Sequence, residues 1–377
     1  MKSNYRKIGE HILLVDERNR GLQVKQLLGL SISKQFIPSV ANIIGTDMEN
    51  YKIIRKNQFA CSTMQVRRDK KMPVALLQEI DEAIISQAYP IFEVKNDNEL
   101  LPEYLMMWFT RSEFDREACF NAVGGVRGSL EWEDFCEMQL PIPSITKQRE
   151  IVKEYNVIQN RIALNQQLIQ KLEDTAQAVY KQWFLEGETD KTSTLSDYVI
   201  TNPKVELKKG ISAPYIEMAD LSETSMCIGG LITRSYLGGS RFQNNDTLLA
   251  RITPCLENGK TGFVDVLNEK EVAAGSTEFI VMRAKKNISP YWVYCLAKDE
   301  GFRAFAISTM VGSSGRQRVH EKYLEKFQLP TIDFVKMDRF NVTAKPIFSI
   351  IKLKSLENQK LTEMKELLLS KLATIEN

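Results

Sequence analysis

The most constraining feature of this 377-residue chain is that its second half repeats its first. A shift of 188 positions aligns residues 57–124 with the second half without a gap, and a one-residue slip brings two QLP strings into register. The identities that this alignment keeps are Asn57 with Asn245, Pro102 with Pro290, Phe114 with Phe302, Val123 with Val311, Gly124 with Gly312 and Arg127 with Arg316. Both copies contain a strand-like apolar run, a polar loop, a proline and an aromatic helix. We therefore expect two copies of one domain.

Each copy is followed by a segment with the period of a long helix. In the first segment, after LPIPSITKQ, apolar residues alternate at spacings of four and three, which is the pattern of a coiled coil. The predicted contact residues of this helix are Ile151, Tyr155, Ile158, Ile162, Asn165, Ile169, Leu172, Val179 and Trp183. A buried asparagine such as Asn165 selects the register of a coiled coil at a cost in stability, so its replacement by leucine should raise stability. The alternative is one amphipathic helix lying on its own domain.

The second helical segment is less regular. Pro346 is expected to interrupt its start, and lysine and asparagine enter its seam. A seam with lysines needs a partner helix that tolerates them, so we expect the two long helices to pair with each other. We expect an antiparallel pair, because the whole domain between the helices gives the chain enough length to return. The predicted fold is α/β (α+β), with two repeated domains, each followed by a long helix, and an antiparallel coiled coil. The expected bounds are 1–143 and 188–331 for the domains, and 144–187 and 332–377 for the spacer helices.

The sequence lacks the patterns of common catalytic sites. Gly259-Lys260-Thr261 has Pro254 where a phosphate-binding loop needs glycine. Asn202-Pro203-Lys204 lacks the second proline and the aromatic residue of an adenine-methyltransferase loop. Two histidines, and six cysteines in no C-x-x-C pair, offer no metal-ligand spacing, so we expect no metal, no cofactor and no catalytic residue in this chain. Charges throughout the N-terminal segment, and no apolar run of ~18 residues, predict a cytoplasmic protein.

Basic residues gather in corresponding regions of the two halves, although the net charge is only +2. A nucleic-acid binder of this charge must concentrate its basic residues on one face. Loops between strands can bring such side chains to phosphates and base edges. For any one of them, the alternative is a solvated surface charge. The residues predicted to contact DNA are Lys34, Arg55, Arg67, Arg68, Lys70, Arg127, Arg241, Arg251, Lys260, Ser313, Arg316 and Arg318.

Two glycine-rich loops occupy equivalent places in the repeat. VGGVRGS begins at Val123 and VGSSGRQR at Val311, each after a predicted helix and before QLP. Glycine allows close approach of the backbone, and a neighbouring arginine can bind phosphate or guanine through its two-pronged guanidinium. The alternative is an ordinary helix C-cap turn. Because loop and arginine recur together, we favour DNA contact at Arg127 and Arg316.

The segment LPIPSITKQREIVKEYNVIQNRIALNQQLIQKLEDTAQAVYKQWF, from Leu140, resembles the central region of specificity subunits of type I restriction-modification systems. The shared features are the proline pair, the QREIV helix entry, the Asn-Gln pair and the terminal Trp-Phe. DTLLARITPCLENGKTGFV, from Asp246, and YKIIRKNQFACSTMQVRR, from Tyr51, resemble that family's target-recognition domains. The second helix departs from the pattern, because Pro346 interrupts it and no Trp-Phe ends it.

The resemblance implies a sequence-specific DNA-binding subunit that is not itself an enzyme. Its two target-recognition domains would each read one half of a split duplex site, and the helices would hold the halves apart. Two modification subunits would bring S-adenosylmethionine and methylate adenine, and two restriction subunits, where present, would use ATP and Mg²⁺ to translocate and cleave DNA. The alternative is a coiled-coil adaptor whose duplicated domains bind only proteins, which the near-neutral charge favours.

Overall fold

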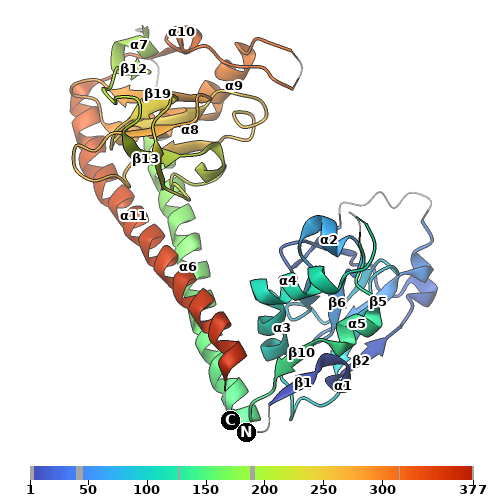
Figure 1. Ribbon diagram of the computed structural model, residues 1–377. Helices are drawn as coiled ribbons and strands as arrows, with labels where there is room; N and C mark the ends of the chain where they lie inside the picture. The colour runs from blue at the N-terminus through green and yellow to red at the C-terminus, as the bar shows by residue number, and fades with distance from the viewer. Residues whose placement is uncertain (1–3, 40–45, 126–127, 187–191, 314, 376–377) are drawn as a thin grey trace. The chain divides into compact units, whose positions relative to one another are not determined.

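The computed structural model describes residues 4–39, 46–125, 128–186, 192–313 and 315–375 (Figure 1). Internal contacts divide the chain into two units. The first consists of Met1–Arg161 with Leu361–Asn377, and the second of Ile162–Lys360. The two long helices, α6 (Ile145–Phe184) and α11 (Phe334–Lys371), therefore contribute residues to both units.

The first unit contains one α/β domain built from short elements. Its strands are β1 (Tyr5–Lys7), β2 (Ile12–Val15), β3 (Leu28–Leu30), β4 (Phe36–Pro38), β5 (Lys52–Arg55), β6 (Phe59–Cys61), β7 (Val74–Leu76), β8 (Glu82–Ile85), β9 (Ile91–Val94) and β10 (Gln139–Pro141). Its helices besides α6 and α11 are α1 (Ile8–His11), α2 (Val66–Asp69), α3 (Pro102–Thr110), α4 (Ser112–Asn121) and α5 (Trp132–Glu137).

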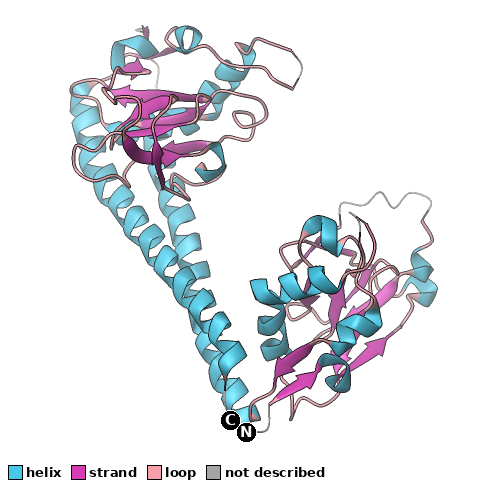
Figure 2. Ribbon diagram, in the orientation of Figure 1, coloured by secondary structure: helices cyan, strands magenta, loops and turns pink. Residues whose placement is uncertain are grey.

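The second unit contains a domain with the same order of strands and, apart from α2, of helices (Figure 2). Its strands are β11 (Thr192–Thr194), β12 (Val199–Thr201), β13 (Ser212–Ile216), β14 (Ile232–Ser235), β15 (Ser240–Phe242), β16 (Thr247–Ala250), β17 (Thr261–Phe263), β18 (Ala273–Gly275), β19 (Phe279–Ala284) and β20 (Gln328–Pro330). Its helices besides α6 and α11 are α7 (Leu195–Tyr198), α8 (Pro290–Lys298), α9 (Glu300–Ser308) and α10 (Glu321–Leu324).

Sheet topology confirms the duplication seen in the sequence. The central antiparallel sheet has the order β2-β9-β6-β7 in the first unit and β12-β19-β16-β17 in the second. In both, the strand at the start of the domain also pairs with the QLP strand, β1 with β10 and β11 with β20. The prolines of the repeat, Pro102 and Pro290, each lie in the first turn of a helix, where the missing N–H costs nothing.

Large aromatic residues fill the core beside each sheet. In the first unit, Phe59 and Phe92 stack with ring centroids 4.9 Å apart, and Phe109 meets both rings edge-on. In the second, Trp292 of α8 is almost completely buried and contacts Tyr180 of α6. The aromatic helix that follows each repeated proline thus packs onto the sheet, which explains why both features recur together.

The two domains differ in their second layer of strands. The second unit forms another four-stranded sheet, β14-β13-β18-β15, in which β13 and β18 run parallel and the other pairs are antiparallel. The described part of the first unit has the corresponding antiparallel pairs, β3 with β4 and β5 with β8, but a single parallel bridge between Leu27 and Ile84 joins them. The repeat therefore preserves the central sheet and, in a less regular form, the layer beside it.

The long helices pair with each other in antiparallel orientation, as the sequence predicts. In the first unit, Ile151 near the start of α6 shares a core with Leu372, just beyond the end of α11. In the second, Ala176 in the later part of α6 shares a core with Ala344 in the early part of α11. Figure 1 shows the two helices side by side. The predicted α/β fold with a domain before each paired helix is confirmed.

Pro346 does not interrupt α11, contrary to the sequence-based expectation. The helix begins at Phe334 and continues through the proline to Lys371. A proline inside a helix removes the hydrogen bond to the carbonyl four residues earlier, here that of Val342. The side chain of Val342 is 73% exposed, so water can reach this part of the helix and satisfy the freed carbonyl. Packing of Phe340, Ala344 and Phe348 on the domain core supports the helix on its other side.

Candidate nucleic-acid interface

The two glycine-rich loops are closed in the same way at their base. Val123 and Ser129 exchange two backbone hydrogen bonds (2.8 and 3.0 Å), and Val311 and Arg318 do the same (3.0 and 2.9 Å). The glycine after each valine has a positive φ, 108° at Gly124 and 131° at Gly312, a conformation that favours glycine. Each loop is thus closed at its base by a β-bridge and begins with a glycine in the left-handed region.

These glycines are not helix caps, which was the alternative interpretation. Helix α4 ends with the extended residue Ala122 as its C-cap, and α9 ends with Thr309. Gly124 and Gly312 follow those caps and lie within the bridged loops. The glycines therefore shape the loops and do not terminate the helices.

In the first unit, the loop rests on part of the predicted basic cluster. The guanidinium of Arg67 donates to the carbonyl of Gly124 (2.7 Å), and its backbone N–H donates to the carbonyl of Gly128 (3.2 Å). Arg68 pairs with Asp69 (2.6 Å), and Lys70 is exposed at the end of α2. Arg127 lies outside the described residues. Arg67 therefore braces the loop while its side chain remains on the surface.

The second unit supports its loop through equivalent backbone contacts. Val319 donates its N–H to the carbonyl of Arg251 (2.9 Å), as Leu130 does to Thr63 in the first unit (2.9 Å). Thr253 also donates to the carbonyl of Gln317 (3.1 Å). The loop residues Ser313 and Arg316 are exposed, and the N–H of Arg316 donates to the carbonyl of Ser313 (3.0 Å).

Arg318 at the base of this loop is largely neutralised by Glu278. Its Nε and Nη2 lie 2.9 and 2.8 Å from the carboxylate oxygens. Hydrogen bonding to Arg318 lowers the pKa of Glu278, so the pair remains ionised at neutral pH. A guanidinium held in two-pronged contact with a carboxylate adds little net charge to the surface. Its contribution here is to fix the loop.

The remaining predicted basic residues fall into different environments. Arg241 and Arg251 line one hollow of about 300 Å³. Lys260 is partly buried, and its ammonium donates to the carbonyl of Met218 (3.2 Å). Arg55 is exposed but lies 2.7 Å from carboxylates of both Glu17 and Glu82.

Lys34 is not part of an exposed basic surface. Its side chain is buried, its ammonium donates to Asp115 (2.7 Å) and to the carbonyl of Phe109, and burial lowers its pKa. Asp115 also accepts from the N–H of Met72 (3.1 Å). A buried ion pair of this kind is strongly destabilising to break, because either partner alone leaves an uncompensated charge. Lys34 is therefore engaged in a structural ion pair. A contact with DNA would require its side chain to leave Asp115.

The predicted residues of α6 lie along one side of the helix with graded burial. Ile151, Asn165 and Ile169 are buried. The half-buried members are Tyr155, Ile158, Ile162, Leu172, Val179 and Trp183. Asn165 donates from Nδ2 to Oδ1 of Asn358 on α11 (2.9 Å). Asn165 is therefore one half of a polar pair, which changes the stability effect expected for its replacement.

Sequence reasoning missed two buried residues that attach α6 to the second domain. Tyr180 has no exposed side-chain surface. Glu173 accepts hydrogen bonds from Ser225 Oγ (2.6 Å), the N–H of Met226 (2.9 Å) and the hydroxyl of Tyr294 (3.0 Å), and burial raises its pKa. Glu173 follows the predicted contact residue Leu172, and Tyr180 follows Val179. The buried face of α6 is therefore wider where the helix packs on the second domain.

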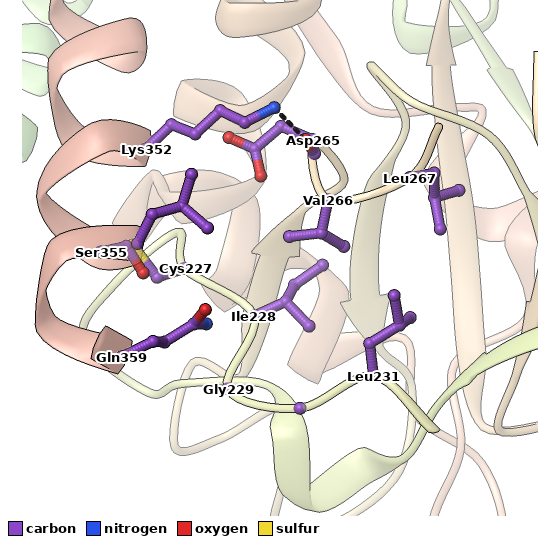
Figure 3. A pocket seen from close by; sticks show the side chains of 12 residues that line it. Cys227, Ile228, Gly229, Leu231, Asp265, Val266, Leu267, Lys352, Ser355 and Gln359 are labelled. Carbon is purple, nitrogen blue, oxygen red and sulfur yellow. Dashed lines mark hydrogen bonds between the residues drawn. The ribbon is translucent and has the colours of Figure 1, made fainter. Parts of the chain in front are cut away.

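A second cavity lies where α11 passes the second domain (Figure 3). It measures about 480 Å³ and is bounded by α11 and by loops containing Cys227 and Asp265. Lys352 of α11 donates to the backbone carbonyl of Asp265. Burial raises the pKa of the Asp265 carboxyl to about 6. This cavity therefore belongs to the attachment of the helix and lies apart from the basic residues.

In the described part of the chain, no group of three or more His, Cys, Asp or Glu residues is arranged to hold a metal ion. Among the same residues, no helix combines the length and the apolar character that crossing a membrane requires.

Known proteins are similar to this chain over part of its length. Residues 41–174 match the family model described as type I restriction modification DNA specificity domain. The chain is 29% identical over 128 residues to the EcoAI specificity subunit of Escherichia coli, covering 34% of this chain and 21% of that protein. It is 24% identical over 162 residues to the HindI specificity subunit of Haemophilus influenzae, covering 42% and 35%. Residues 41–174 therefore resemble the DNA specificity domain of type I restriction-modification systems.

A solved structure shares the fold over the whole described architecture. The S subunit of a type I restriction-modification system from M. genitalium has a TM-score of 0.58 and 14% sequence identity, covering 100% of this chain and 98% of that one. The resemblance to specificity subunits that the sequence indicated is confirmed. The alignments with EcoAI and HindI span 21% and 35% of those proteins, so the partners and activity of the whole protein are inferred below.

Proposed function

We propose that this chain recognises a two-part duplex DNA site and directs modification and restriction subunits to it. Each α/β domain contacts one half-site through its glycine-rich loop and the neighbouring basic residues. The observation that supports this most directly is the repeated loop. In both domains a β-bridge closes the loop. In both, the residue after the bridge also donates its N–H to the segment that follows β6 or β16. A loop that recurs at the same place in both domains is what a duplicated binding role requires.

The chemistry of modification belongs to other subunits in this proposal. The modification subunits bind S-adenosylmethionine and methylate adenine, after the base is extruded from the duplex. Restriction subunits supply ATP- and Mg²⁺-dependent translocation and cleavage. This chain is the non-catalytic DNA-binding component, acting in the cytoplasm where the DNA lies.

Salt dependence of duplex binding separates this function from that of a protein-only adaptor. Contacts to several phosphates make the logarithm of the association constant fall steeply as the logarithm of salt concentration rises, by about 0.9 per phosphate. We expect such a slope for the full chain on duplex DNA of arbitrary sequence. A chain that binds modification subunits but shows a flat salt dependence with DNA is an adaptor, and the proposal is then wrong.

The loop arginines test the assignment of one domain to one half-site. We expect Arg316→Ala to weaken specific binding by about 1–3 kcal/mol, with the loss confined to the half-site read by the second domain. Arg127→Ala should do the same at the other half-site. Lys322→Ala, an exposed residue of α10 outside the loop, is the matched control. The measurement is a genome-wide map of methylated adenines in cells that express each variant with its modification subunit. Equal occupancy of both half-sites by both loop variants contradicts the assignment.

A further inference from the structure

The hollow shared by Arg241 and Arg251 is a preformed environment for an anion. It lies in the second domain beside β15, the end of β16 and the start of β19. Besides the two arginines, Asn202, Ser240 and Thr277 contribute polar groups to its lining. Both guanidinium groups are on the second unit, so the site is complete within one body of the protein.

Arg251 is held in place by its backbone but lacks a partner for part of its side chain. Its N–H donates to the carbonyl of Glu278 (2.9 Å), and its carbonyl accepts from Val319 (2.9 Å). Its Nε is buried and has no hydrogen-bond acceptor among the described residues. A buried donor without an acceptor costs about 1–3 kcal/mol, so the hydrogen-bonding capacity of this guanidinium is not fully used within the described residues.

No carboxylate in the described part of the chain neutralises the two arginines. Glu278 is close enough for the charge of Arg251 to lower its pKa, but both of its oxygens are engaged by Arg318. Neither Arg241 nor Arg251 has an ion-pair partner in the ranges that the structure covers. Two guanidinium groups that face one hollow repel each other, and an anion between them removes that repulsion.

The backbone around the hollow is shaped to allow close approach. Gly239, which also lines it, has a φ of 114°, and a Cβ at this position would lie 2.1 Å from the carbonyl oxygen of Gly275. Any other residue would force β15 away from β18, its partner in the sheet. Glycine at 239 therefore allows β15, which carries Arg241, to pair closely with β18.

We propose that this hollow binds one phosphodiester group of the DNA backbone. This proposal rests on the proposed DNA-binding function. The contact would fix the position of the second domain on the DNA. A phosphate offers several acceptor oxygens to two arginines at once, whereas the acceptor edge of a guanine is satisfied by one. The aromatic ring that lines the hollow, Phe279, is buried in the domain core and offers no stacking surface to a base.

The described residues of the first domain do not repeat this pair of arginines. The repeat places Thr63 at the position of Arg251. Thr63 makes the same backbone contact as Arg251 without its charge. The phosphate contact is therefore specific to the second domain, and the two half-sites are bound by unequal means.

The test is the salt dependence of full-chain binding to two unrelated duplexes. Arg251→Gln should lower the magnitude of the slope by up to about one, and so should Arg241→Gln. The double variant should also lower it by about one in total, because both residues contact one phosphate. Arg251→Lys keeps the charge and should largely retain the slope. Arg234→Gln removes one charge from β14, at the opposite edge of the same sheet, and should leave the slope unchanged.

Each result decides the proposal. A loss of equal size on both duplexes supports a phosphate contact, whereas a loss that depends on sequence identifies a base contact and overturns it. A double variant that lowers the slope by about two indicates two separate phosphates and overturns the shared hollow. An unchanged slope in Arg251→Gln, with a steep slope in the parent chain, refutes this site alone. A flat slope in the parent refutes the DNA-binding function itself. Thermal unfolding of each variant confirms that the domain is intact.

Discussion

The Asn165–Asn358 pair allows a quantitative test of how the helices recognise each other. Asn165 is only 3% exposed, and its amide donates to Asn358 across the helix pair (2.9 Å). Replacement of Asn165 by leucine removes that donor and places an apolar side chain against the amide of Asn358. We expect a loss of stability of about 0.5–1.5 kcal/mol, because the hydrogen bond across the helix pair is lost. This reverses the gain in stability that the sequence alone predicts for the substitution.

The double variant Asn165→Leu/Asn358→Leu should have the opposite effect. With both polar groups removed, the leucines bury apolar surface against each other, and the chain should be at least as stable as the parent. The coupling energy from the four-member cycle of parent, two single variants and double variant should be about 1–3 kcal/mol. The double variant should also form misaligned or oligomeric species, since the residue pair that selects the register is gone.

Urea unfolding followed by far-ultraviolet circular dichroism gives the free energies, and size-exclusion chromatography with light scattering gives the species. Gln167→Leu, at an exposed position of the same helix, is the control and should change stability by less than about 0.5 kcal/mol. Asn165→Leu with the parental or higher stability, and no coupling to Asn358, would show that the pair does not form.

Two further predictions concern the attachment and the length of the helices. Burial raises the pKa of Asp265 to about 6 from its ordinary value of 3.8. The folded chain therefore loses stability as pH rises between these values and stays destabilised above about 6. In urea unfolding at pH 8, Asp265→Asn should be more stable than the parent, and equal stabilities contradict the burial of the charge. One added heptad in each long helix, after Asn165 and before Asn358, lengthens the pair by about 10 Å. The gap between half-sites, mapped by adenine methylation, should widen by about one to three base pairs of ~3.4 Å. An active variant with the parental gap shows that the helices do not set this gap.

The sequence was sufficient to predict the architecture because its signals are local or repeated. The shift of 188 positions predicts two domains, and the same order of central strands appears in both units. The spacing of apolar residues predicts α6 because helix periodicity depends only on neighbours within the chain. Pro346 misled that reasoning, since a local rule against proline was outweighed by packing of the residues on either side of it.

The candidate interface was only partly predictable. Both glycine-rich loops could be predicted from the sequence. A backbone position with a positive φ favours glycine, and this glycine recurs at the same place in both repeats. Glu173 was not, since a glutamate beside a helical seam has the same appearance in the sequence whether it faces water or a buried tyrosine such as Tyr294. The hollow of Arg241 and Arg251 also depends on strands that meet only in the folded domain.

The sequence by itself determined the duplication, the two long helices and the position of the loops. Tertiary structure alone decided which basic residues carry usable charge. Lys34 is neutralised by Asp115, 81 positions away, and Arg318 by Glu278, 40 positions away, whereas Arg251 is left without an acceptor for its Nε among the described residues. The physical reason is that Coulomb energy and desolvation depend on distance in space and on burial, neither of which is recorded in the order of residues along the chain.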